Sequence, residues 1–70
     1  MERDLKKMEE RLEAFEKMLS FIQKNHDDTV MKMEALREEG KVRTATYGQL
    51  MGNKLTYRNM LDLYKLYDLI

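Results

Sequence analysis

The sequence of 70 residues contains no cysteine, no proline and no tryptophan, and its one histidine is His26. Without cysteine the chain forms neither a disulfide nor a thiolate metal site, and one histidine does not supply the ligands of a structural zinc. A chain this short buries only roughly 60% of the surface of its unfolded form. Small domains therefore usually need a further stabilising element, and oligomerisation is the one that remains.

Long apolar runs and a net charge are also absent. No stretch of 18 apolar residues predicts a transmembrane helix, and the N-terminus is charged from Glu2 onward, unlike a secretory signal. We therefore expect a cytoplasmic protein with no membrane partner. Thirteen basic residues balance thirteen acidic ones, which argues against a strong overall attraction to nucleic acid. The halves differ, since residues 1–39 carry 8 basic and 11 acidic side chains and residues 40–70 carry 5 and 2.

Catalytic motifs are missing as well. The three glycines do not form the GxxxxGK[ST] phosphate loop, because Gly52 is followed by Asn, Lys and Leu. The single serine, Ser20, falls within a predicted helix with no base at a triad-like position. Hydrolase chemistry needs a nucleophile, a base and an oxyanion site. We therefore predict that the protein is not an enzyme and holds neither a cofactor nor a metal.

Residues 2–39 contain neither glycine nor proline and are rich in good helix formers. Their apolar side chains recur at alternating intervals of three and four residues, which is the heptad repeat of a coiled coil. Eight of the ten positions in this stripe are apolar. The stripe, which we predict to be the oligomer seam, consists of Leu5, Met8, Leu12, Phe15, Leu19, Ile22, His26, Thr29, Met33 and Leu36.

The two polar members of the stripe, His26 and Thr29, allow two interpretations. Either one long helix carries a polar layer, or residues 25–28 break the helix and Asp28 caps a second one. We favour the continuous helix because the segment lacks glycine and proline and the heptad phase is the same on both sides. Consecutive side chains on a helix point about 100° apart, so His26 and Asp27 do not converge on a metal ion. A buried polar layer instead helps to fix register and partner number.

The remainder of the chain predicts two shorter helices. Gly40 has the position of a helix C-cap, and residues 40–46 read as an extended connector. Thr46 and Gln49 have the spacing of a capping box, which predicts a helix over 47–54, and Thr56 precedes a helix over 57–69. Six side chains form an apolar arc on the last helix: Met60, Leu63, Tyr64, Leu66, Tyr67 and Ile70. We expect this arc to pack on the outer apolar set of the long helix: Ala14, Met18, Phe21, Val30, Met31 and Ala35.

The expected fold is therefore all-α: a long coiled-coil-like helix, two shorter helices packed back on it, and a single-domain bundle completed by oligomerisation. The expected function is that of a small interaction or adaptor protein, a homo-oligomer and most simply a dimer, with a further protein partner still to be identified. In a parallel dimer the charges of Asp4 and Glu9 would repel. An antiparallel dimer can instead place Glu9 near Arg37, so we favour that orientation.

A second hypothesis is a small nucleic-acid-binding regulator. Residues 41–58 contain four basic side chains, no acidic one and two tyrosines, and two consecutive short helices would suit a helix-turn-helix. The predicted contacts are Lys41, Arg43, Lys54 and Arg58. The last helix argues against this hypothesis, because most of its surface is apolar and Asp62 lies among its exposed polar residues.

Overall fold

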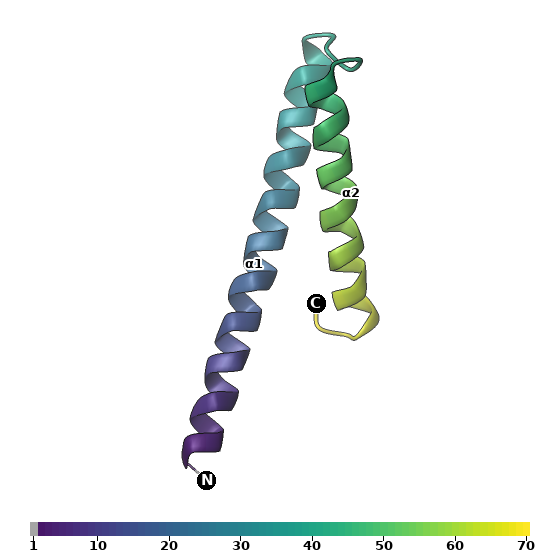
Figure 1. Cartoon of the computed structure of the whole chain (residues 1–70). Helices are drawn as coiled ribbons and strands as arrows, with labels where there is room; N and C mark the ends of the chain where they lie inside the picture. The colour runs from purple at the N-terminus through teal and green to yellow at the C-terminus, as the bar shows by residue number, and fades with distance from the viewer. Residues whose placement is uncertain (1) are drawn as a thin grey trace.

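The computed structural model describes the backbone of residues 2–70 and the side chains from Asp4 onward. It contains two helices, α1 (Glu2–Glu38) and α2 (Ala45–Leu66), which run antiparallel as a hairpin (Figure 1). No strand is present among residues 2–70. The prediction of an all-helical chain that begins with a long helix is therefore confirmed.

The helix α1 is continuous through residues 25–28, as we predicted from its unbroken heptad phase. It ends where the first glycine occurs. Gly40 has a φ of +75°, and the amide of Lys41 donates to the carbonyl oxygen of Leu36 at 2.8 Å while the amide of Gly40 donates to Arg37 at 3.0 Å. This pair of bonds is a Schellman motif, which satisfies the last carbonyls of α1 and turns the chain back.

The prediction of two short helices after Gly40 is wrong, because α2 is a single helix from Ala45 to Leu66. Its N-cap is Thr44 and not Thr46, since the Thr44 hydroxyl accepts a bond from the amide of Tyr47 at 3.2 Å. Thr56 does not begin a helix. Its hydroxyl donates to the carbonyl oxygen of Gly52 one turn earlier, at 3.1 Å, which a residue inside a helix can do.

A second heptad stripe explains why α2 continues through its two glycines. The six residues of α2 that are buried or half-buried recur at intervals of three and four: Tyr47, Leu50, Lys54, Tyr57, Leu61 and Tyr64. A glycine inside a helix costs about 1 kcal/mol relative to alanine, and packing of this stripe on α1 offsets that cost. Tertiary contacts thus override the local signals at Gly48 and Gly52.

Contacts at both ends of α2 set its register on α1. Near the turn, an Arg37 Nη atom donates to the Tyr47 hydroxyl at 3.0 Å. This hydrogen bond raises the pKa of Arg37. Near the other end, the rings of Phe15 and Tyr64 meet edge to face with their centroids 5.2 Å apart. The seam of the hairpin therefore runs from Phe15 to Arg37 on α1.

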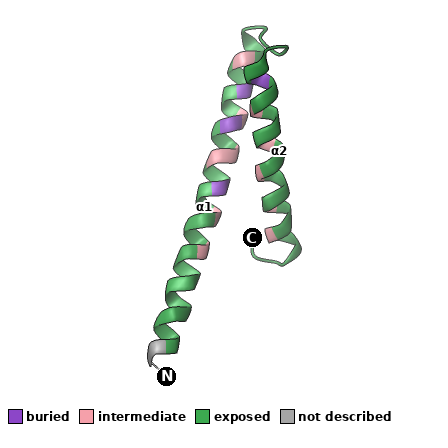
Figure 2. Cartoon of the chain, viewed as in Figure 1, coloured by how far each residue is buried: buried purple, intermediate pink, exposed green. Residues whose placement is uncertain are grey.

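The hairpin is elongated and its core is thin. It measures 58 × 19 × 16 Å and has a radius of gyration of 16.7 Å, whereas a compact chain of this length would have about 11 Å. Among the described side chains only Ile22, Thr29, Met33 and Tyr47 are buried. Figure 2 shows that these residues cluster in the half of the hairpin nearer the turn. The other half has no fully buried residue in the part of the chain that the structure describes.

Replacing both helix glycines, Gly48→Ala with Gly52→Ala, should stabilise the protein. A Cβ atom at either position meets no atom within 4 Å, so the methyl groups cause no clash. Each substitution removes a helix penalty of roughly 0.5–1 kcal/mol. We expect the free energy of unfolding, measured by urea denaturation, to rise by about 1–2 kcal/mol. A loss of stability would show that another surface approaches the glycines closely in the native assembly.

Candidate functional site

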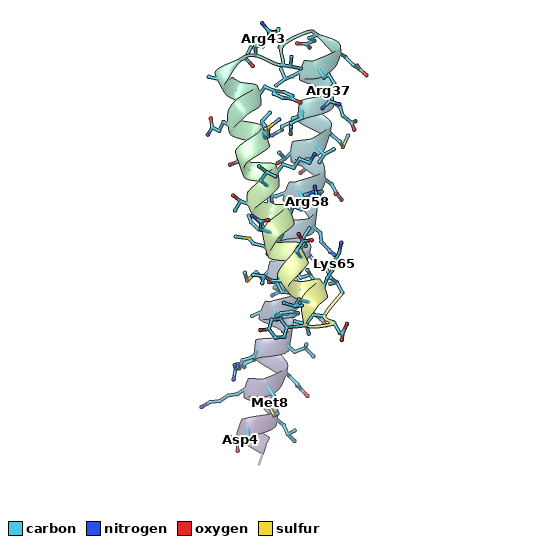
Figure 3. All side chains as sticks on the ribbon, turned by 90° about the vertical axis from the view of Figure 1, so that its right-hand side faces the viewer. Asp4, Met8, Arg37, Arg43, Arg58 and Lys65 are labelled. Carbon is cyan, nitrogen blue, oxygen red and sulfur yellow. The ribbon has the colours of Figure 1, made fainter. Side chains whose placement is uncertain are left out.

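The candidate site lies at the open end of the hairpin, where α1 extends beyond α2. Phe15, whose ring contacts Tyr64, is the first half-buried residue of α1, and the side chains of residues 4–14 are all exposed. Residues 2–14 therefore form an overhang of roughly 20 Å at 1.5 Å per residue. Figure 3 shows Asp4 and Met8 on this overhang, below the end of α2. The stripe members Leu5, Met8 and Leu12 are 61%, 65% and 57% exposed. This end of the predicted seam is uncovered within the chain.

An apolar groove adjoins the overhang at the level of the last turns of α2. It has a volume of about 290 Å³ and is lined by Met18, Met60, Leu63, Tyr64, Tyr67 and Leu69. Four of the six side chains, those of the two methionines and two leucines, carry no hydroxyl, amide or charged group, and the two tyrosines supply the only hydroxyls. A mostly apolar lining of this kind is typical of a binding site for an apolar group.

 Leucine and methionine supply four of the six lining side chains, and none of the six is a carboxylate, an amine or a guanidinium. The groove therefore suits an apolar side chain of a protein and not a charged ligand.

The chain itself closes one end of this groove. Asp68 has a φ of +57°, a conformation that aspartate tolerates better than most residues. The amide of Leu69 donates to the carbonyl oxygen of Tyr64 at 2.9 Å, and the amide of Asp68 donates to Lys65 at 3.0 Å. This second Schellman motif ends α2 and folds the last residues back (Figure 1), which places Leu69 in the groove wall.

Packing of the C-terminal apolar arc on the outer apolar set of α1 was predicted wrongly. Within the arc only Tyr64 is half-buried, while Leu63, Leu66 and Tyr67 are exposed. In the outer set Met18, Phe21 and Met31 are exposed as well. The physical reason is that two antiparallel helices cover only one stripe on each other, so a second apolar stripe has no neighbour within one chain.

The ten residues of the predicted oligomer seam divide into two groups in the structure. From Phe15 to Leu36 they are buried or half-buried in the described hairpin, where α2 of the same chain covers them. The first three, Leu5, Met8 and Leu12, remain exposed. A role of the seam between chains therefore stays a prediction, and the overhang is the part of the seam that is available for it.

The polar layer predicted at His26 and Thr29 faces α2. Thr29 is buried, and His26 is half-buried with its Nδ1 atom 3.2 Å from an Asp27 carboxylate oxygen. His26 also lines a depression of about 410 Å³ together with Lys54, Leu61 and Asp62, among other residues. In the part of the chain from Asp4 onward, no group of three potential ligands could hold a metal ion.

The four basic residues of the nucleic-acid hypothesis lie in two separate places. Lys41 and Arg43 are in the turn, and Lys41 pairs with Glu39 at 3.1 Å. Lys54 and Arg58 are on α2, partway down the hairpin, where Asp62 lines the same depression. Figure 3 shows that the labelled Arg43 lies at the turn, whereas Arg58 lies well below it along the hairpin. Since α2 is one helix, residues 41–58 do not form the two consecutive short helices of a helix-turn-helix, and nucleic-acid binding stays a prediction.

No protein-family model, no curated protein and no solved structure matches this chain. Neither α1 nor α2, over the residues that the structure describes, has a segment long and apolar enough to span a membrane. The candidate site at the open end of the hairpin rests on the exposed overhang and the apolar groove.

Sequence reasoning found the overhang residues but missed the groove. The signal for the groove was the uninterrupted spacing of the α2 stripe from Tyr47 to Tyr64, which predicts one helix and hence one covered face. The residues Met60, Leu63 and Tyr67 lie outside this covered face of α2, and all three lie on one side of it, where they line the groove.

Proposed function

We propose that the protein is a self-associating helical hairpin that acts through protein contacts, as a small homo-oligomeric interaction or adaptor protein. The observation that carries this proposal is the excess of exposed surface. The chain exposes 6214 Å², whereas a folded monomer of 8.5 kDa typically exposes about 4,700 Å². The excess is roughly 1,500 Å², and association with another chain is the way to cover it.

The nature of the exposed surface supports association. Fifteen large apolar side chains are exposed among the described residues, against three that are buried. Contiguous exposed apolar patches on monomers are rarely larger than a few hundred Å², and larger patches usually mark interaction sites. The chain is electrically balanced, with thirteen charges of each sign, so two copies do not repel each other as whole molecules.

Sedimentation equilibrium at micromolar concentration tests this proposal. We expect a mass of at least twice the 8.5 kDa of one chain. The Leu63→Glu variant, which places a charge in the groove, should raise the Kd of self-association at least about tenfold, because desolvating the carboxylate costs more than 1.4 kcal/mol.

Leu55→Glu is the matched control for this variant. Leu55 is on the same helix and is 51% exposed, close to the 59% of Leu63, but it does not line the groove. Its Kd should stay near that of the wild type. A clean monomer with a cooperative melt would contradict the proposal and indicate a self-contained hairpin.

A further inference from the structure

Two apolar surfaces remain uncovered at the open end of the hairpin, and they are of similar length. On the overhang, Leu5 and Leu12 are seven positions apart, or roughly 10 Å along the helix. On α2, Met60 and Tyr67 of the groove wall are also seven positions apart. The apolar stripe of one overhang therefore matches the length of one groove.

The overhang does not fill the groove of its own chain. The helix α1 is continuous from Glu2 to Glu38, so Leu12 lies about 9 Å further along the axis than Met18, at 1.5 Å per residue. Only a break in α1 would fold the overhang back. Outside α2, the only parts of the chain that line the groove are Met18 of α1 and Leu69 of the C-terminal segment.

The two long sides of the hairpin differ in chemistry, which favours docking on the groove side. On the groove side, Met18 flanks the seam from α1, and Met60 and Tyr67 flank it from α2. On the other side, α2 presents Arg58 and Lys65 beside His26. An apolar helix stripe is therefore accepted by one side only.

Resting on the proposed self-association, we propose that the occupant of the groove is the overhang of a second copy of this chain. In the resulting dimer each copy inserts Leu5, Met8 and Leu12 into the groove of the other. A two-fold axis across the open ends relates the copies, so every overhang finds a groove and the assembly closes. The two α1 helices then run antiparallel to each other.

The buried area suits a stable dimer. Complete burial of one such side chain covers roughly 60–120 Å², and about half of that is still exposed on each of the eight that would meet. For the sixteen side chains of two copies this gives roughly 500–1,000 Å² of apolar surface, or about 800–1,600 Å² with the usual share of polar rim. Specific interfaces bury roughly 1,200–2,000 Å². The eight residues are Leu5, Met8, Leu12, Met18, Met60, Leu63, Tyr67 and Leu69.

Charge does not oppose this docking. The overhang, residues 2–14, carries four basic and five acidic side chains, so its net charge is only −1. The groove wall contains no ionisable carboxylate or amine. The charged residues of the overhang can therefore stay in water while its apolar stripe is buried.

Cross-linking between two single-cysteine variants tests the arrangement. The natural chain has no cysteine, so each introduced thiol is unique. The Met8→Cys and Leu63→Cys variants are mixed in equal amounts and equilibrated in a glutathione redox buffer. We expect the mixed disulfide to be the main product. Glu10→Cys replaces Met8→Cys in the control, because Glu10 is exposed and lies outside the stripe, and it should give little mixed disulfide.

The outcomes separate this inference from the proposed function. If sedimentation gives a dimer but Met8→Cys links mainly to itself, the overhangs pair with each other and reciprocal docking is overturned while self-association stands. A dimer in which only Leu63→Cys links to itself overturns it equally, since the grooves then face each other. A monomeric mass without any cross-link overturns both proposals, and the groove and stripe are then left to a helix of another protein.

Discussion

The Ile22→Ala variant is expected to lose most of the stability of the protein. Ile22 is 2% exposed, the lowest value among the buried apolar residues, and it is one of only four described side chains that are buried. Truncating a buried Ile to Ala costs about 2–5 kcal/mol, and a domain of this size has little more than that to lose. Urea denaturation followed by circular dichroism should show a strongly lowered midpoint.

Met31→Ala provides the control for this variant. Met31 is on the same helix, loses a side chain of similar size, and is 66% exposed. We expect its free energy of unfolding to stay within about 0.5 kcal/mol of the wild type, as is usual for surface substitutions. If Met31→Ala were as damaging as Ile22→Ala, the core of one hairpin would not be the main source of stability.

The long helix could be predicted from the sequence because all of its local signals agree. Residues 2–39 have good helix formers, no glycine, and one heptad phase from Leu5 to Leu36. Gly40 marks the end of the helix because glycine adopts the left-handed backbone conformation without strain. In the structure Gly40 has this conformation, with a φ of +75°. Such agreement among helix propensity, apolar spacing and capping is typical of a segment whose structure the sequence specifies strongly.

The second helix could not be predicted in the same way because its local signals disagree with its packing. Gly48 and Gly52 weaken a helix, and Thr56 has the chemistry of an N-cap. What keeps α2 continuous is the covered stripe from Tyr47 to Tyr64, whose energy comes from contacts with α1. Local propensity is a weak guide where tertiary packing supplies the larger contribution.

The candidate site was only half predicted for a related reason. The heptad pattern identified Leu5, Met8 and Leu12 as apolar contacts, but a heptad pattern does not state which helix covers it. In the structure α2 covers the seam from Phe15 onward, which leaves these three residues beyond its end. The length difference between α1 and α2, 37 against 22 residues, thus creates the site.

Replacing two half-buried polar residues of the seam, His26→Leu with Lys54→Leu, is expected to raise the stability of the protein and to weaken its choice of register. Both residues occupy seam positions and line the same depression, although apolar residues fill most other layers. Exchanging buried polar or charged groups for apolar ones of similar volume often stabilises a protein by roughly 1–4 kcal/mol. A seam with leucine at these two positions also fits after α2 slides by one heptad along α1, because His26 and Lys54 no longer oppose the shift.

Urea denaturation and an amide NMR spectrum measure the two effects of this double variant. The midpoint should rise, and the spectrum should show broadened or additional peaks where the wild type shows one set. Lys24→Leu is the control, because Lys24 is exposed on α1 outside the seam, and it should change neither result. A lower midpoint would show that His26 and Lys54 stabilise the fold directly. A single sharp set of peaks would show that the Arg37–Tyr47 hydrogen bond and the Phe15–Tyr64 ring contact fix the register without His26 and Lys54.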